Sequence, residues 1–243
     1  MRRRFMEEKA YRQEIKSLLS QPRALLLENR ISSVLKPDEH AGSEGAYFIR
    51  SIYFDTENDK AYREKLMGIS EREKYRIRMY DLNADMVQLE RKEKRENLIH
   101  KDAVTISRAT ADEVVQGNFE GLLAYDHPLA AEMYSKAKAE LLKPVVVVDY
   151  QRRAYTYPAG NVRITFDSKL QSKRIEDGVW NTDALYDVLG ENTILEMKFN
   201  RYLPEHIRQL LCSVPSQRMA MSKYTLCREN LYRKQGYLLG GRG

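Results

Sequence analysis

The stretch KYRIRMYDLNADMVQLERKEK, residues 74–94, decides the fold that we expect. Before a turn at residues 81–85 its basic residues alternate with apolar ones, and after the turn Glu90, Lys92 and Lys94 again lie two residues apart. A period of two is the side-chain period of a β-strand, so each charged set projects from one face of its strand. The stretch therefore predicts a hairpin with an apolar face against a core and a charged face formed by Arg76, Arg78, Glu90, Lys92 and Lys94.

Alternation alone is also typical of an ordinary half-exposed sheet, so its recurrence elsewhere decides the interpretation. Further strands are expected at residues 11–18, 46–54, 98–106, 145–157, 161–167 and 193–199, and residues 168–192 read as a polar loop or weak strand. Helices are expected between Pro22 and Pro37 and at 58–67, 110–117, 128–142, 204–211 and 222–233. About eight strands with helices in unequal clusters predict an α+β fold with a mostly antiparallel sheet.

Composition restricts the class of protein and the class of ligand. A chain of 243 residues with 42% hydrophobic and 31% charged residues can bury a large core beneath a wet surface. The formal net charge of +6 favours an anionic ligand but does not separate nucleic acid, lipid and nucleotide. The two cysteines, Cys212 and Cys227, are expected to be free buried thiols, and no apolar run is long enough to span a bilayer. We expect a cytoplasmic protein.

Charges embedded in the expected strands are mostly basic. They are Arg12, Glu14, Lys16, Arg50, Arg76, Arg78, Glu90, Lys92, Lys94, Lys101, Arg152, Arg163, Glu196 and Lys198. A sheet closed into a barrel or tunnel would give these side chains a common interior, which would require a polyanion for charge balance. Arg forks and Lys point charges suit phosphate chains, and the few carboxylates suit Mg²⁺ or Mn²⁺, with Glu196 the best candidate.

Eight ordered blocks of sequence carry a resemblance to a known family. They are RxExK (12–16), IRSIYFD (49–55), KYRIRMY (74–80), LExKxK (89–94), YxRxAY (150–155), VRITFD (162–167), ILEMK (194–198) and SKY (222–224). The chain resembles the VTC domain, the polyphosphate polymerase domain of the vacuolar transporter chaperone complex and its bacterial relatives. This domain belongs to the triphosphate tunnel metalloenzymes, or CYTH-like superfamily. The resemblance implies a single domain at residues 11–234, between a flexible extension at 1–10 and a flexible tail at 235–243.

The resemblance implies a closed, eight-stranded antiparallel β-tunnel with flanking helices and a metal-dependent phosphotransferase activity. The γ-phosphate of ATP would pass to inorganic polyphosphate, or to pyrophosphate or triphosphate, with release of ADP. The implied catalytic residues are Arg76, Arg78, Lys92, Lys198 and Glu196. The implied phosphate-binding residues are Lys16, Arg50, Arg76, Arg78, Lys92, Lys94, Lys101, Arg152, Arg163, Lys198, Ser222 and Lys223. Mn²⁺ or Mg²⁺ would be held by Glu196, with Glu14 and Glu90 as helpers.

Several alternatives stay open at this point. Lys94 and Lys101 also fit the lysines that protect strand edges from aggregation, and Ser222 also fits a helix cap. Glu14 and Glu90 also fit ion pairs with neighbouring basic residues. The chain has Gln13 where family members often have His. A triphosphate hydrolase acting on inorganic, thiamine or nucleoside triphosphates and a non-catalytic polyphosphate-binding module remain alternatives. Nucleic-acid binding has only the net charge in its favour, and coupling to transport would need a separate membrane partner.

Overall fold

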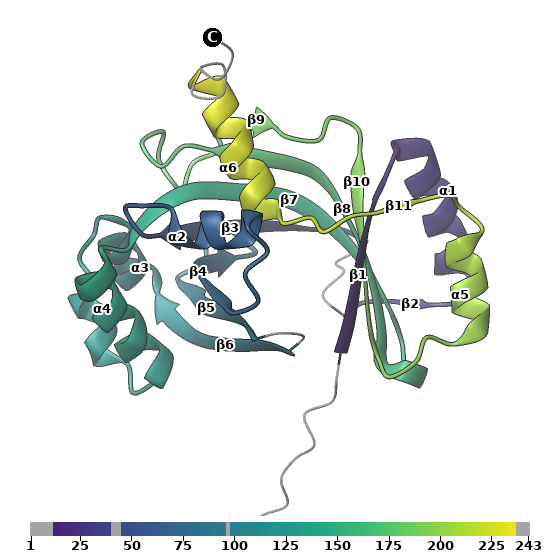
Figure 1. The fold of residues 1–243 in the computed structure, drawn as a ribbon, viewed down its shortest axis with the longest axis horizontal. Helices are drawn as coiled ribbons and strands as arrows, with labels where there is room; N and C mark the ends of the chain where they lie inside the picture. Colours follow the sequence, from purple (N-terminus) through teal and green to yellow (C-terminus); the bar gives the residue numbers. More distant parts are fainter. Residues whose placement is uncertain (1–11, 40–44, 96–97, 237–243) are drawn as a thin grey trace, which may run out of the picture. The chain divides into compact units, whose positions relative to one another are not determined.

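The computed structural model describes residues 12–39, 45–95 and 98–236. The expected extension at 1–10 and residues 237–243 of the expected tail lie outside the described residues. The strands are β1 (Arg12–Leu19), β2 (Lys36–Pro37), β3 (Tyr47–Asp55), β4 (Arg72–Met79), β5 (Met86–Arg95), β6 (Leu98–Ser107), β7 (Lys143–Tyr157), β8 (Val162–Lys173), β9 (Tyr186–Asp187), β10 (Thr193–Asn200) and β11 (Gln217–Arg218). The helices are α1 (Gln21–Ser32), α2 (Lys60–Leu66), α3 (Arg108–Val115), α4 (Pro128–Glu140), α5 (Glu205–Cys212) and α6 (Lys223–Lys234), with 3₁₀ turns η1 (Glu120–Ala124) and η2 (Ala159–Asn161) (Figure 1).

The strands follow the order β11-β1-β10-β8-β7-β3-β4-β5-β6, with β2 beside β7 and β9 beside β8. Neighbouring strands such as β4 and β5 pair antiparallel, and so do β1 and β10. The α+β class, the antiparallel sheet and the flanking helices are therefore confirmed. The described sheet has eleven strands rather than eight, and its path ends at β11 and β6 without hydrogen bonds that would close it.

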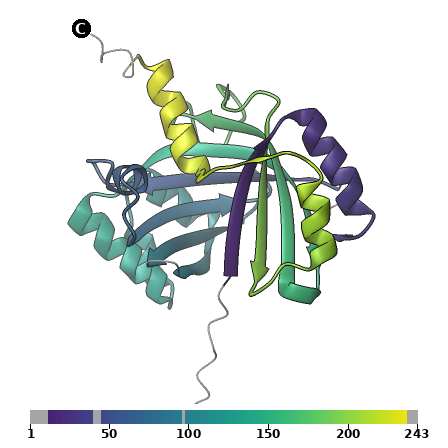
Figure 2. The ribbon, with the colours of Figure 1, turned by 45° about the vertical axis from the view of Figure 1, so that its right-hand side comes forward.

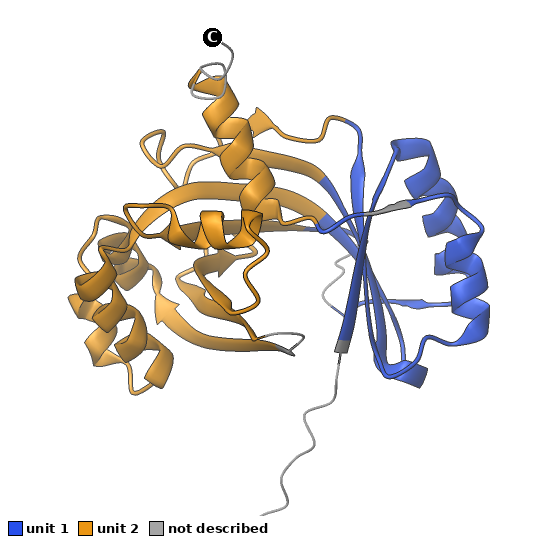
Figure 3. Ribbon diagram, in the orientation of Figure 1, with its two compact units in different colours: residues 1–47, 152–168, 191–220 blue, residues 48–151, 169–190, 221–243 orange. Residues whose placement is uncertain are grey.

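The chain divides into two compact units (Figure 3). Unit 1 contains residues 1–47, 152–168 and 191–220, and unit 2 contains residues 48–151, 169–190 and 221–243. Three of the boundaries fall within strands, after the first residue of β3 and inside β7 and β8, so these strands contribute to each unit.

In unit 1, helices α1 and α5 lie side by side over one face of the strands (Figures 1 and 2). Leu27 and Ile31 of α1 and Ile207 of α5 are completely buried in an apolar cluster with alternate residues of β8 and β10. Each such side chain contributes roughly 1.5–3 kcal/mol by leaving water. The alternate residues that remain belong to the opposite, polar face of the same strands.

In unit 2, helices α3 and α4 cover the apolar face of β4, β5 and β6. Ile77 of β4, Leu89 of β5 and Ile106 of β6 are fully buried against Val114 of α3 and Met133 of α4. The alternation read from residues 74–94 is thus confirmed, because one face of this hairpin packs on a core. The face that carries the basic residues points away from α3 and α4.

Some expected details are wrong for local reasons. Helix α3 begins at Arg108, before its expected start at residue 110, because Ser107 caps it and its hydroxyl accepts from the Thr110 backbone N–H at 3.1 Å. Helix α4 ends at Glu140, before its expected end at residue 142, because Leu141 takes a left-handed conformation at φ 53°. Strand β8 continues to Lys173, beyond the expected end at Asp167.

Two further expectations concern the thiols and the membrane. Both cysteines are free thiols, but only Cys227 is buried, since Cys212 is exposed. Among the described residues, no helix combines the length and the hydropathy that crossing a bilayer requires.

Candidate functional site

The polar face of β4, β5 and β6 gathers a large excess of positive charge. Strand register places Lys92 opposite Lys74 on one side and Lys101 on the other, and Arg72 opposite Lys94. Cross-strand partners project from the same face of a sheet. We call this surface the cationic face, and it comprises Arg72, Lys74, Arg76, Arg78, Lys92, Lys94 and Lys101, with Glu90 as its one carboxylate within the three described strands.

Glu90 lies at the centre of the cationic face and contacts three of its basic residues. Its Oε2 lies 2.7 Å from Arg76 Nε and 3.8 Å from Arg78 Nη1, and its Oε1 lies 2.7 Å from Lys101 Nζ. Burial raises the pKa of Glu90, but the opposite effect of Arg76, Arg78 and Lys101 is larger, so the pKa is lowered to about 2. Both oxygens are thus engaged by cations, which favours the ion-pair interpretation of Glu90 over that of a metal ligand.

Two tyrosines fix the arginine heads from the neighbouring strands. Arg76 Nη1 donates to the Tyr53 hydroxyl at 2.9 Å, and Arg78 Nη2 donates to the Tyr150 hydroxyl at 3.3 Å. Lys223 of α6 places its Nζ 4.9 Å from the centre of the Tyr150 ring, a cation–π contact. Arg78 Nε is buried and has no hydrogen-bond partner among the described residues. The arginine heads are therefore held in place while retaining donor capacity.

The N-terminus of α6 adds to the cationic face. Ser222 is the N-cap, its hydroxyl accepts from the Thr225 backbone N–H at 3.5 Å, and it also accepts from Lys74 Nζ at 3.2 Å. The helix-cap interpretation of Ser222 is thus confirmed, and it does not remove the side chain from the site. Tyr224, the third residue of the SKY block, donates to Asp55, which also accepts from the Ala61 backbone N–H at 2.9 Å. Asp55 therefore ties β3 to α2 and α6.

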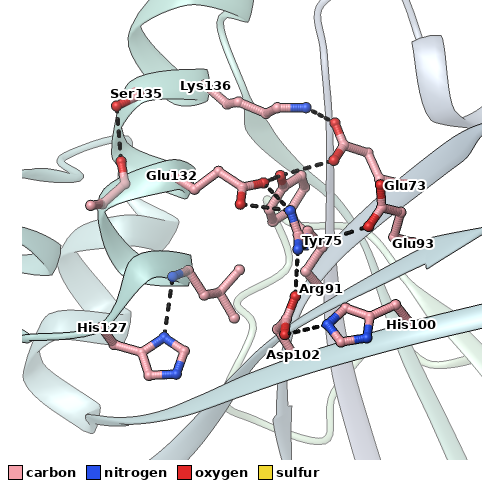
Figure 4. Close-up of polar contacts among 12 residues, drawn as sticks. Glu73, Tyr75, Arg91, Glu93, His100, Asp102, His127, Glu132, Ser135 and Lys136 are labelled. Atoms are coloured by element: carbon pink, nitrogen blue, oxygen red, sulfur yellow. Dashed lines mark hydrogen bonds and ion pairs between the residues drawn. The ribbon is translucent and has the colours of Figure 1, made fainter. Parts of the chain in front are cut away.

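On the opposite face of the same strands, the charged side chains form ion pairs with one another (Figure 4). There Arg91 lies between carboxylates, 2.6 Å from Glu132 and also in contact with Asp102. His100 Nε2 lies 2.7 Å from Asp102, and Lys136 of α4 contacts Glu73. Charges on this face are matched by opposite charges, whereas the three strands of the cationic face bring seven basic residues together with one carboxylate.

In unit 1, the polar face of β1 and β10 carries two acid–base pairs. Register places Glu14 opposite Lys198 and Lys16 opposite Glu196. Lys16 Nζ lies 2.7 Å from Glu14 and 3.7 Å from Glu196, and Lys198 Nζ lies 2.6 Å from Glu196. The structure thus brings these four predicted residues together, with Glu196 buried at their centre.

Two further predicted residues of unit 1 are held by aspartates. Arg163 Nε lies 2.8 Å from Asp38, and its Nη2 lies 3.1 Å from the Tyr47 hydroxyl. Arg152 makes a bidentate pair with Asp167, at 2.6 and 2.8 Å. Arg163 is also the cross-strand partner of Lys198, so it lies beside the cluster around Glu196.

Arg50 is the predicted site residue whose environment disagrees most with phosphate binding. Register places it opposite Met79, on the apolar face of the sheet and not on the cationic face. Its side chain is 0% exposed and donates to Asp149 at 2.8 and 2.5 Å, to Val179 O at 2.9 Å and to Asn181 O at 2.7 Å. Four of its roughly five N–H groups are used internally. We correct its expected role to that of a structural ion pair, because a buried charge requires such partners.

The metal expectation can be examined against the same geometry. Within residues 12–39, 45–95 and 98–236, no three or more His, Cys, Asp or Glu side chains are grouped to hold a metal ion. The expected ligands Glu196, Glu14 and Glu90 therefore do not form one protein-only site. Glu14 and Glu196 share Lys16 as a neighbour, and Mg²⁺ or Mn²⁺ needs only one or two carboxylates where phosphate oxygens complete the shell. In this structure both carboxylates are paired with lysines, as Glu90 is with its cations, so an ion would bind them only by displacing Lys16.

Sequence reasoning missed several contributors to the site. Lys74 lies within the block KYRIRMY at the same two-residue spacing as Arg76 and Arg78, so the signal was present. Tyr53 and Tyr150 gave no such signal, because their hydroxyls reach the arginines from strands that are distant in sequence. The side chain of Arg12 lies outside the described residues.

Comparisons with known proteins complete the description of the site. A family model described as the VTC domain matches residues 11–232. A putative adenylyl cyclase from Hippeastrum, described as having a dominant triphosphatase activity, has a similar structure at a TM-score of 0.54 and 18% identity, over 89% of this chain and 94% of that one. A putative adenylate cyclase from Bacillus halodurans gives a TM-score of 0.50 at 14% identity, over 88% and 93% of the two chains. No curated protein matches the chain significantly.

Proposed function

The chain belongs to the VTC domain family, and on that premise we propose that it is a polyphosphate polymerase. It transfers the γ-phosphoryl group of ATP to the end of an inorganic polyphosphate chain and releases ADP. The observation that supports this most is the cationic face, where Lys74, Lys92 and Lys101 lie side by side across three strands. Like charges opposite one another destabilise a sheet, and a phosphate chain would offset that cost. A cytoplasmic location, where ATP is available, is part of the proposal.

The reaction requires positioning and charge stabilisation rather than a strong base. A terminal phosphate of the acceptor is already ionised near neutral pH, so its oxygen can attack the γ-phosphorus while the bond to the ADP oxygen breaks. Arg76 and Arg78, fixed by Glu90, Tyr53 and Tyr150, donate to the oxygens on which negative charge develops. Donors that are already oriented cost little reorganisation when the charge appears.

The lysines and the acidic pair have complementary roles in the proposal. Lys92 and Lys198 supply point charges to the phosphates, and Lys16, Lys94, Lys101, Arg163 and Lys223 bind the chain. Arg152 stays in the proposed phosphate-binding set through its position on the polar side of β7, although Asp167 engages it. Glu196 and Glu14 would hold Mg²⁺ or Mn²⁺, which when bound neutralises phosphate charge. Glu90 is assigned to orienting the arginines.

Hydrolysis of a triphosphate is the second candidate. Polymerase and hydrolase chemistry differ in whether phosphate or water attacks, and the same cations serve both. The Hippeastrum protein, which shares the fold, is described as having a dominant triphosphatase activity. The substrates would be inorganic, thiamine or nucleoside triphosphates.

Incubation with ATP and Mn²⁺, followed by gel analysis of phosphate chains and assay of ADP, tests the proposal. We expect long chains from the wild type and from Arg208→Ala, a control that removes an exposed charge on α5. We expect Arg76→Ala to slow the reaction about 10²–10³-fold, as loss of an oriented donor does, and Glu196→Gln to slow it as well. Orthophosphate without chains would indicate the hydrolase. Equal product from every variant would show that the site is misplaced.

A non-catalytic polyphosphate-binding module is distinguished by the same variants. A module that only binds would release no ADP, and Glu196→Gln would change its affinity for polyphosphate little. Titration calorimetry with tripolyphosphate measures that affinity directly.

A further inference from the structure

Thr165, in the middle of β8, carries a buried hydroxyl that has no hydrogen-bond partner within the described residues. The residue is 4% exposed, and its Oγ1 contacts no donor or acceptor at hydrogen-bonding geometry. Burying a hydroxyl without a partner destabilises a folded protein, and the great majority of buried polar groups have one. A retained exception therefore calls for an explanation, such as a ligand that satisfies the hydroxyl when it is bound.

The register of unit 1 shows what surrounds this hydroxyl. Thr165 is the cross-strand partner of Glu196, which is in turn the partner of Lys16, so the three form one row across β8, β10 and β1. The adjacent row on the same face consists of Arg163, Lys198 and Glu14. The neighbours of Thr165 along β8, Ile164 and Phe166, belong to the apolar cluster on the other face. The hydroxyl is therefore directed to the charged side of the sheet and not to the core.

Internal partners on that side are already engaged. Glu196, the nearest acceptor by register, contacts Lys198 Nζ at 2.6 Å through one oxygen and Lys16 Nζ at 3.7 Å through the other. The two rows hold three basic residues and two carboxylates, and Asp38 engages Arg163 from outside the rows. An incoming phosphate oxygen would find Lys16 and Lys198 around it, with Arg163 beside them. Such an oxygen accepts hydrogen bonds, and the Thr165 hydroxyl can donate one.

We propose that Thr165 is a phosphate-binding residue, whose Oγ1 donates a hydrogen bond to an oxygen of the bound phosphate chain beside Glu196. The inference rests on the proposed function in that it takes the ligand to be a phosphate chain, but it does not depend on whether that chain is extended or hydrolysed. The hydroxyl is already desolvated, so the new bond forms without removing water from it, but the side chains that cover Oγ1 must move aside before a phosphate oxygen reaches it. The Thr165 hydroxyl thus destabilises the ligand-free protein and stabilises the complex with the phosphate chain.

Removing the hydroxyl should therefore weaken phosphate binding without lowering the stability of the ligand-free protein. Thr165→Val keeps the shape of the side chain and removes the unsatisfied hydroxyl, so we expect its melting temperature to equal or exceed that of the wild type. We expect its affinity for tripolyphosphate, measured by titration calorimetry, to fall about tenfold, the usual scale for a hydrogen bond to a charged group. Thr165→Ser, which restores the hydroxyl, should bind within about threefold of the wild type on the same scale.

A matched control is available on the other face of the same sheet. Thr193 of β10 is also buried, and its two-residue spacing places it on the same face as Leu195 and Met197 of the apolar cluster. Thr193→Val should leave the affinity for tripolyphosphate unchanged. Each titration is run in EDTA and again in Mg²⁺, because a water bound to a metal ion is the other group that could occupy the place of the phosphate oxygen.

Three results would overturn the inference. They are unchanged affinity in Thr165→Val, a lowered melting temperature together with lowered affinity, which indicates a structural role, and a loss of affinity that appears only in Mg²⁺, which assigns the hydroxyl to the water shell of the metal. If the wild type binds tripolyphosphate but makes no chains from ATP, the polymerase proposal fails while the Thr165 result is still decided. A wild type that binds no tripolyphosphate overturns both.

Discussion

At the scale of a single residue, Glu90 shows how one carboxylate organises several cations. It is 3% exposed and holds Arg76, Arg78 and Lys101. Without it, the two arginine heads would be buried beside each other with tyrosine hydroxyls as their main partners. Breaking a buried ion pair by removing one member typically costs about 3–5 kcal/mol, because the remaining charge is left uncompensated. The acidity of Glu90 therefore has consequences for both stability and binding.

The first prediction concerns the pH dependence of stability. The pKa of Glu90 is lowered from 4.5 to about 2, so its contribution is present above pH 4.5 and is lost as the pH falls toward 2. A shift of this size corresponds to stabilisation on the order of 3 kcal/mol at pH 7. Glu90→Gln should therefore be less stable than the wild type at pH 7. At pH 3 the difference in unfolding free energy should be less than about half of the difference at pH 7.

Urea unfolding at several pH values measures that difference. Glu93→Gln, on the opposite face of β5, is the matched control. It should show a smaller difference because Glu93 is more exposed, and its partners are the exposed Arg95 at 2.5 Å and Arg91 at 3.9 Å. A difference between Glu90→Gln and the wild type that stays constant from pH 7 to pH 3 would contradict the assigned cause.

Arg50 shows where reading single residues fails. A lone charge in an apolar strand requires a partner or a ligand, and for Arg50 the partner, Asp149, lies 99 residues away in the sequence. Arg50 directly precedes Ser51, which faces Arg78, and a shift of one position moves a side chain to the other face. The sequence alone does not fix that register, because both faces of β3 are buried.

At the scale of the elements, alternation predicted β1, β4, β5 and β10 and the face that each charge occupies. A period of two is a local property, and it survives folding wherever one face packs on a core. Elements that depend on distant contacts were missed. Strand β8 continues to Lys173 because Gln171 and Ser172 pair with Asp187 and Tyr186 of β9, which follows after a loop. The two-residue strand β2 pairs with Tyr155 and Thr156, far along the chain.

The second prediction tests the row of lysines across β4, β5 and β6. Lys92 lies between Lys74 and Lys101, and like charges opposite one another cost about 0.2–1 kcal/mol per pair. Lys92→Gln should therefore raise the free energy of unfolding of the ligand-free protein by up to about 1 kcal/mol. The same change should weaken tripolyphosphate binding roughly tenfold, as loss of a charged hydrogen bond does.

Arg91 is the matched control for Lys92, since it is the next residue and projects from the other face. It contacts Glu132 at 2.6 Å, so Arg91→Gln should lower stability and leave tripolyphosphate binding unchanged. Unfolding with and without tripolyphosphate separates the two effects. If Lys92→Gln and Arg91→Gln changed stability and tripolyphosphate affinity equally, the cationic face would not be the face that binds phosphate.

At the scale of the whole molecule, the question is whether net charge or local placement selects the ligand. The chain carries 41 Lys and Arg against 35 Asp and Glu, an excess that would attract any polyanion. The placement of the cations is more selective than their number. The side chains of Arg76 and Arg78 are only 17% and 10% exposed, so they lie within reach of a thin, flexible phosphate chain but not of a wide duplex.

The last prediction therefore compares polyanions. Unlabelled tripolyphosphate should displace labelled polyphosphate at far lower phosphate concentration than duplex DNA does. Affinity for polyphosphate should also decline as salt rises, because the screening length falls from about 10 Å at 0.1 M to about 3 Å at 1 M. If net charge alone determined binding, every polyanion would displace labelled polyphosphate at the same phosphate concentration. Equal displacement by DNA would therefore support the nucleic-acid interpretation. Selective displacement would show that recognition resides in the partly buried arginines, where only a narrow chain can enter.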